Sequence, residues 1–163
     1  MSSPTALSKP VLVVCIGNAL IADDGVGVAI FERLSALALP AHVEVKRVGV
    51  AGLALLDEMN GEDTLIVVDA VRLGAAPGTI HVLEWDELPE REGRPVSVHG
   101  IGVQQVVELG RCLYPERTPR HVVLVGVEGT CFNRLGEGLS AEVEEAVEGA
   151  KNAVLDCARR YAG

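Results

Sequence analysis

Aromatic residues are scarce in this chain of 163 residues, which has one tryptophan, two tyrosines and two phenylalanines. Hydrophobic residues nevertheless make up 48% of the chain, so its core is built mainly from valine, leucine, isoleucine and alanine. This aliphatic composition is typical of parallel strands that are buried on both faces. A domain of this length buries about 70% of the surface of its unfolded chain. It therefore needs neither disulfides nor a structural metal to fold.

Cysteines are few and widely separated. The chain has no C-x-x-C pair and no spacing of cysteine and histidine typical of a zinc finger. Free cysteine is among the most buried residue types. We therefore expect buried structural thiols in a reducing compartment at all four positions: Cys15, Cys112, Cys131 and Cys157.

Long apolar runs and an excess of basic residues are also missing. Residues 1–10 lack the apolar core of a signal peptide, and no run approaches the roughly 20 residues that span a bilayer. The 14 basic and 23 acidic residues give a net charge of −9, which argues against a nucleic-acid partner. We expect a cytoplasmic protein with no membrane insertion.

The common signatures of hydrolases are absent. The chain contains no G-x-S-x-G, no H-E-x-x-H, no P-loop and no paired Asp-Thr-Gly or Asp-Ser-Gly loops. Gly25 and Gly27 lack the third glycine of a dinucleotide-binding fingerprint. A nucleotide- or phosphate-binding α/β domain therefore remains only a weaker alternative.

Five aliphatic runs predict five strands, at residues 11–16, 43–48, 65–68, 79–83 and 122–127. Segments with helical spacing separate most of them. This alternation predicts an α/β fold, a three-layer α/β/α sandwich with a mostly parallel twisted sheet. The fourth run follows the third without a helix, so we expect residues 65–68 and 79–83 to form an antiparallel edge pair. We expect a single domain over residues 1–163, in which residues 1–10 form a flexible N-terminal lead.

Apolar residues at helical spacing mark the helices. The first three stripes are Val26, Ile30 and Leu34; Leu53, Leu56 and Met59; and Val103, Val106, Val107 and Leu113. The last helix has the clearest pattern, with Ser140 as its expected N-cap and glutamates in its first turns. Its apolar face comprises Val143, Val147, Ala150, Val154, Cys157 and Tyr161.

Two carboxylates and one imidazole are candidates for a metal site. Asp24 follows the first strand at the start of a helix, Asp69 ends the third strand, and His99 precedes the third helix. Open α/β sheets bind their ligands at the carboxyl ends of their strands. Oxygen and nitrogen ligands with open positions suit nickel, zinc, iron or manganese. We therefore expect Asp24, Asp69 and His99 to share one metal.

Each of these residues also has a purely structural interpretation. One aspartate of the Asp23–Asp24 pair could cap the following helix, and we assign that role to Asp23. Asp69 could be a hydrogen-bonded turn residue, and His99 a loop histidine with satisfied hydrogen bonds. For His42, His81 and His121, which lie in or beside strands, the structural interpretation is preferred.

Two long loops leave the strand ends. Residues 85–98 are rich in charge, and residues 128–138 contain three glycines. Loops of this length in a small domain are more often functional than idle, although the first could equally be a solvated surface loop. We expect them to flank the metal site and to recognise a protein surface or a flexible peptide tail.

Three motifs together resemble the hydrogenase maturation proteases. They are Gly17-Asn18-x5-Asp24-Gly-Val-Gly27, Ile66-Val-Val-Asp69-Ala and Ser97-x-His99. Further matches are Val48-Gly-Val-Ala-Gly52-Leu, Val125-Gly-Val-Glu128 and Gly138-Leu-Ser140. The similarity runs from Val11 to Tyr161, and the order and spacing of the motifs make the combination specific.

The resemblance implies an α/β/α sandwich and an endopeptidase. Its substrate would be the precursor of a [NiFe] hydrogenase large subunit, which loses a C-terminal extension after nickel insertion. The family's metal-contacting positions map to Asp24, Asp69 and His99, which are also the candidates for a catalytic role. The nickel would be carried by the precursor rather than held as a prosthetic metal. The alternative is a nickel-sensing assembly chaperone that binds through the same three residues without cleaving.

Overall fold

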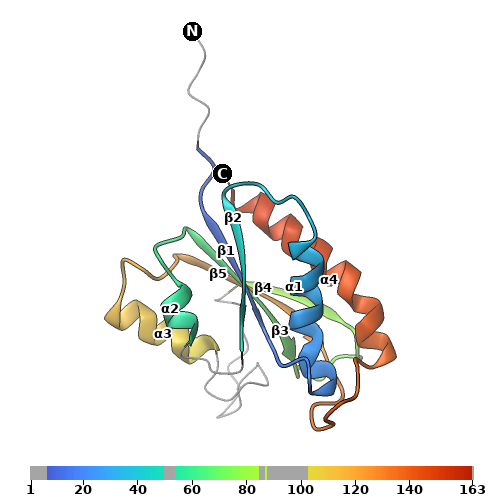
Figure 1. Ribbon diagram of the computed structural model, residues 1–163. Helices are drawn as coiled ribbons and strands as arrows, with labels where there is room; N and C mark the ends of the chain where they lie inside the picture. The colour runs from blue at the N-terminus through green and yellow to red at the C-terminus, as the bar shows by residue number, and fades with distance from the viewer. Residues whose placement is uncertain (1–6, 50–53, 85–86, 88–102, 163) are drawn as a thin grey trace.

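The structure, a computed structural model, describes residues 7–49, 54–84, 87 and 103–162. Five strands form one sheet: β1 (Val11–Ile16), β2 (Val43–Val48), β3 (Thr64–Val71), β4 (Ile80–Glu84) and β5 (His121–Glu128). The helices are η1 (Ala22–Gly25), α1 (Val26–Ser35), α2 (Ala54–Glu58), α3 (Val103–Leu113) and α4 (Ala141–Arg160). Helices flank the sheet on both sides (Figure 1), so the predicted α/β fold with its mostly parallel sheet is confirmed.

The strand order is β2-β1-β3-β5-β4, with β4 as the antiparallel strand. An antiparallel edge strand was expected, but its expected pairing with residues 65–68 is wrong. Parallel pairing with β1 and β5 occupies both edges of β3, which is buried along its whole length. The chain after β3 therefore passes to the outer edge of β5, where the partly exposed β4 pairs with it.

The two faces of the sheet carry separate aliphatic clusters. One face packs against α1 and α4, and its buried residues include Val13, Ile30 and Val147. The other face packs against α2 and α3 and includes Val67, Leu55 and Val106. Alternate residues of each strand point to opposite faces, so every central strand contributes to both clusters.

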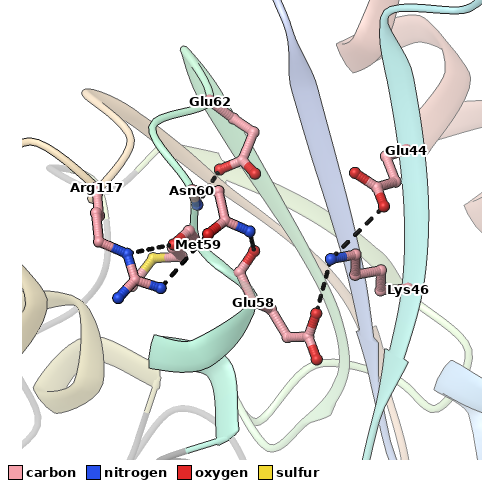
Figure 2. Close-up of polar contacts among 7 residues, drawn as sticks. All are labelled: Glu44, Lys46, Glu58, Met59, Asn60, Glu62 and Arg117. Carbon is pink, nitrogen blue, oxygen red and sulfur yellow. Dashed lines mark hydrogen bonds and ion pairs between the residues drawn. The ribbon is translucent and has the colours of Figure 1, made fainter.

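Polar contacts anchor the short helix α2. Figure 2 shows Lys46 of β2 between two carboxylates, and its Nζ lies 2.9 Å from Oε2 of Glu58. The hydrogen bond from this ammonium to Glu58 raises the pKa of Lys46, which favours its charged form. Beyond the helix, Nε of Arg117 donates to the carbonyl oxygen of Met59 at 3.1 Å. These contacts fasten a five-residue helix that is too short to be stable by itself.

The helices agree with the predicted stripes, with differences at their ends. Val143, Val147, Ala150, Val154 and Cys157 of α4 are buried. Leu113 is 56% exposed because it lies at the end of α3. In α2 the buried leucine is Leu55 rather than Leu56, and Leu53 lies outside the described residues. Ser140 occupies the N-cap position of α4, but its side chain does not cap that helix.

The four cysteines are free but are not all buried. Cys15 and Cys157 are buried, whereas Cys112 is exposed and Cys131 is partly exposed. The expectation of buried thiols is therefore wrong for Cys112 and Cys131. Cys112 lies near the end of α3, and Cys131 lies in the loop after β5, and neither position faces one of the two aliphatic clusters.

The N-terminal segment is tied to the C-terminus where it can be described. The backbone N–H of Lys9 donates to the carbonyl oxygen of Ala162 at 3.0 Å, and Pro10 accepts from Asp63. Among the helices within 7–49, 54–84 and 103–162, none has both the length and the apolar character of a membrane span.

Candidate functional site

Two glycines let the loop after β1 fold tightly against the strand that it leaves. A Cβ atom on Gly17 would clash with the carbonyl oxygen of Asp24, and one on Gly27 would clash with that of Ile16. The loop closes through the N–H of Asn18, which lies 3.2 Å from the carbonyl oxygen of Asp24. The glycines of this motif therefore serve close backbone packing at the carboxyl end of β1.

Asp24 lies in η1, directly after this loop, and is only 5% exposed. Its Oδ2 accepts a hydrogen bond from the N–H of Asn18 at 3.2 Å. The helix α1 starts two residues later, with no side chain capping it. The sequence thus folds this carboxylate back over the end of β1, the edge where α/β proteins place their ligands.

Asp69 is fully buried and lies inside β3, which runs two residues beyond it to Val71. It was expected to end the strand. Pairing with β1 stops at Val68, whereas pairing with β5 continues to Val71. Asp69 is thus the first residue of β3 beyond its pairing with β1, and η1 contacts β3. Its Oδ1 accepts the N–H of Ala70 at 2.8 Å.

The structure therefore brings two of the three predicted ligands to one edge of the sheet. His99 lies outside the described residues, as does nearly all of the loop at 85–98. Within the described part of the chain, no three His, Cys, Asp or Glu side chains form a metal-binding group. The three-ligand site of Asp24, Asp69 and His99 stays a prediction.

Asp23, beside Asp24, does not cap α1 as predicted. Its carboxylate instead accepts backbone N–H groups of Thr130 and Cys131 at 2.9 Å and of Ser140 at 2.7 Å. The hydroxyl of Ser140 donates to it as well, at 3.1 Å. Burial would raise the pKa of Asp23, but these four hydrogen bonds outweigh burial and lower it. An ionised Asp23 thus joins η1 to the loop after β5 and to the start of α4.

Glu128 is a further buried carboxylate, to which the sequence analysis assigned no role of its own. It ends β5 and accepts the N–H groups of Leu73 and Ala75 at 2.9 Å. Nε2 of His81 lies 3.4 Å from its Oε1. Glu128 therefore holds the turn between β3 and β4, whose return to the outer edge of β5 depends on these contacts. Because its partners are distant in sequence, no local pattern could have revealed this role.

The chemistry of this edge suits a borderline divalent metal. The carboxylate oxygens of Asp24 and Asp69 are the candidate ligands, and both residues are buried beside aliphatic strands. An ionised carboxylate in such a place requires hydrogen-bond donors or a cation. The exposed apolar hollow of about 410 Å³ lies elsewhere, at the start of β2 and the end of α4, near His42 and Leu155.

The sheet order and the buried carboxylates at its carboxyl edge define an α/β protein with its candidate site at the strand ends. The model of the hydrogenase maturation protease family matches residues 28–157, most of the chain. The chain belongs to this family, and its class is therefore that of a peptidase, a hydrolase.

Known relatives agree with this assignment. The hydrogenase 2 maturation protease of Escherichia coli is 35% identical over 151 residues, 91% of this chain and 90% of that protein. The hydrogenase expression/formation protein HupD of Thiocapsa roseopersicina is 34% identical, and this chain spans 66% of its length. The solved structure of the hydrogenase maturating endopeptidase HybD from E. coli has a TM-score of 0.79 at 33% identity, with 93% of each chain covered.

Proposed function

We propose that this protein is a nickel-dependent endopeptidase that removes the C-terminal extension of a [NiFe] hydrogenase large-subunit precursor after nickel insertion. One observation carries the proposal. Two buried carboxylates, Asp24 and Asp69, lie near the carboxyl ends of β1 and β3, whose side chains are otherwise mainly aliphatic. This is the edge at which α/β proteins bind their ligands, and carboxylate oxygens are suitable ligands for a divalent metal.

In this proposal the nickel belongs to the substrate. Asp24, Asp69 and His99 bind a nickel ion that the precursor already holds through its own cysteine ligands. Three protein ligands without a thiolate leave coordination positions for those cysteines. A precursor without nickel lacks this contact and is not held for cleavage, so cleavage reports that insertion is complete. Nickel, bound there, could also polarise a carbonyl or a water.

The proposed partner is the large-subunit precursor, and the proposed location is the cytoplasm. The four free cysteines within the described residues are consistent with a reducing compartment. Asp23 and Glu128 accept hydrogen bonds from this chain's own backbone, so contacts within the chain hold η1, the loop after β5 and the turn after β3 in place.

The test is incubation of the purified protein with nickel-loaded and nickel-free precursor, followed by intact mass measurement. We expect loss of the C-terminal peptide from the loaded precursor alone. Equal cleavage of both precursors would contradict the nickel dependence. Nickel-dependent binding without any cleavage would instead identify a nickel-sensing assembly chaperone.

A further inference from the structure

Two leucines stand out among the exposed residues because both lie at the candidate edge. Leu20 in the loop after β1 is 67% exposed, and Leu135 in the loop after β5 is 77% exposed. Figure 1 shows these loops together at the lower edge, next to the start of α4. Single exposed leucines are ordinary on protein surfaces, but two on adjoining loops beside a candidate site call for a physical reason.

Backbone contacts join the two loops into one unit. Ile21 and Leu135 form an antiparallel bridge, and the N–H of Gly136 donates to the carbonyl oxygen of Leu20 at 2.9 Å. We call residues 20, 21, 135 and 136 the leucine tip. Asp23, two residues from Ile21, fixes the tip to the protein through its bonds to Thr130, Cys131 and Ser140. The leucines are therefore presented on an ordered support, which reduces the entropy that binding would cost.

The two charged residues that flank the tip in the loop after β5 pair with each other. Arg134 and Glu137, which flank Leu135 and Gly136, lie 3.5 Å apart and form an ion pair with each other. The tip therefore offers apolar surface without a net charge of its own, which favours an apolar patch on the partner. Two leucines cover far less than the roughly 1,200 Å² that stable interfaces bury. A transient partner such as a substrate fits better than a second copy of this chain.

We propose that the leucine tip is a docking contact for an apolar patch on the folded part of the precursor. This inference rests on the proposed function, because it takes the precursor as the substrate. Asp24 lies in the helical turn that follows Ile21. A protein whose metal reaches Asp24 must therefore lie over or beside the tip. The contact would select the folded precursor, while the metal ligands select its nickel-loaded form.

The test uses a double variant, Leu20→Ala with Leu135→Ala, in the full chain. We expect the Kd and the KM for nickel-loaded precursor to rise about tenfold with kcat unchanged. The reason is that each substitution removes apolar carbon atoms that the docking contact would bury. Leu113→Ala removes another exposed leucine, 56% exposed at the end of α3, and should change neither constant. Leu20→Met with Leu135→Met keeps the apolar area and should restore values close to those of the wild type.

The outcomes separate this inference from the proposed function. If the wild type binds loaded precursor without cutting it, the proposed function fails, and the docking contact is judged on Kd alone. Unchanged Kd and KM in the double alanine variant would overturn the docking contact while leaving the protease intact. It would also be overturned if the wild type bound no precursor, or if sedimentation showed self-association that the double variant loses.

Discussion

The two layers of helices around the sheet are built in contrasting ways. The α1/α4 layer has helices of 10 and 20 residues over a continuous aliphatic cluster. The α2/α3 layer has a helix of five residues that needs polar anchors, and a second of 11 residues. Asp69 and Glu128 point to this second side, because they alternate with Ala70 and Val127 of the α1/α4 cluster. The α1/α4 layer packs on a mainly aliphatic face of the sheet, whereas the face on the α2/α3 side includes buried carboxylates.

The sharpest test of this contrast is Asp69→Asn, which removes the charge but keeps the shape. We expect cleavage of nickel-loaded precursor to fall by about a hundredfold, because the proposed metal site loses one of its carboxylates. Thermal unfolding should show a folded protein, since the amide can still accept a hydrogen bond. Asp57→Asn, at an exposed position of α2, is the matched control and should cleave normally. Normal cleavage by the Asp69 variant would remove Asp69 from the site.

The opposite result is expected for Ile30→Ala in α1. Ile30 is fully buried in the α1/α4 cluster, and such truncations cost about 2–5 kcal/mol of unfolding free energy. Urea denaturation would measure this loss. The cleavage rate per folded molecule should stay within about twofold of the wild type. A much larger loss of rate would show that the two layers are not separable.

Asp23→Asn tests the hydrogen bonds that join η1 to the loop after β5 and to the start of α4. We expect a loss of about 1.5–3 kcal/mol near neutral pH, because hydrogen bonds to a charged group are weakened. The folded state lowers the pKa of Asp23 below its usual value of 3.8, so this stabilisation is present above that value. It disappears as the pH falls through the folded-state pKa. Urea denaturation at several pH values should therefore show the variant and wild type converging in acid, and a constant difference would contradict this assignment.

Thiol labelling should have the smallest effect on stability, and it compares the accessibility of the four cysteines. Burial, with a smaller contribution from the charge of Asp69, raises the pKa of Cys15 to about 12, and burial also raises that of Cys157. Iodoacetamide at about pH 8 should therefore modify Cys112 and Cys131 first, because the thiolate is the nucleophile. Peptide mass mapping reads the result. Labelling Cys112 should change the unfolding free energy by no more than about 0.5 kcal/mol, whereas rapid labelling of Cys15 would mean that the α1/α4 layer opens.

Local patterns predicted the parts of the fold that depend on local sequence. The aliphatic runs predicted the strands, and the apolar spacing predicted α1 and α4, because burial acts on each segment separately. Chain order predicted that β4 pairs with β3, but β1 and β5 occupy both edges of β3, so β4 pairs with β5 instead. Aspartate is a common N-cap residue, yet the hydrogen-bond donors to Asp23 lie more than 100 residues away in the sequence. The positions of Asp24 and Asp69 near the carboxyl ends of β1 and β3 could be predicted because each follows an aliphatic run, although β3 continues two residues past Asp69.

The bond between Asp23 and Ser140 joins residues 117 positions apart, and this separation bears on the order of folding. Long-range contacts of this kind are closed late, since the loop entropy must be offset by other structure first. The bond from Ser140 forms only once the start of α4 is in place, in addition to the bonds from Thr130 and Cys131 that tie the loop after β5 to the same carboxylate. In a chain that emerges from the ribosome, β1 and η1 therefore appear long before Thr130 and Ser140, and the buried carboxylate of Asp23 gains these hydrogen bonds only after the C-terminal part of the chain has been made.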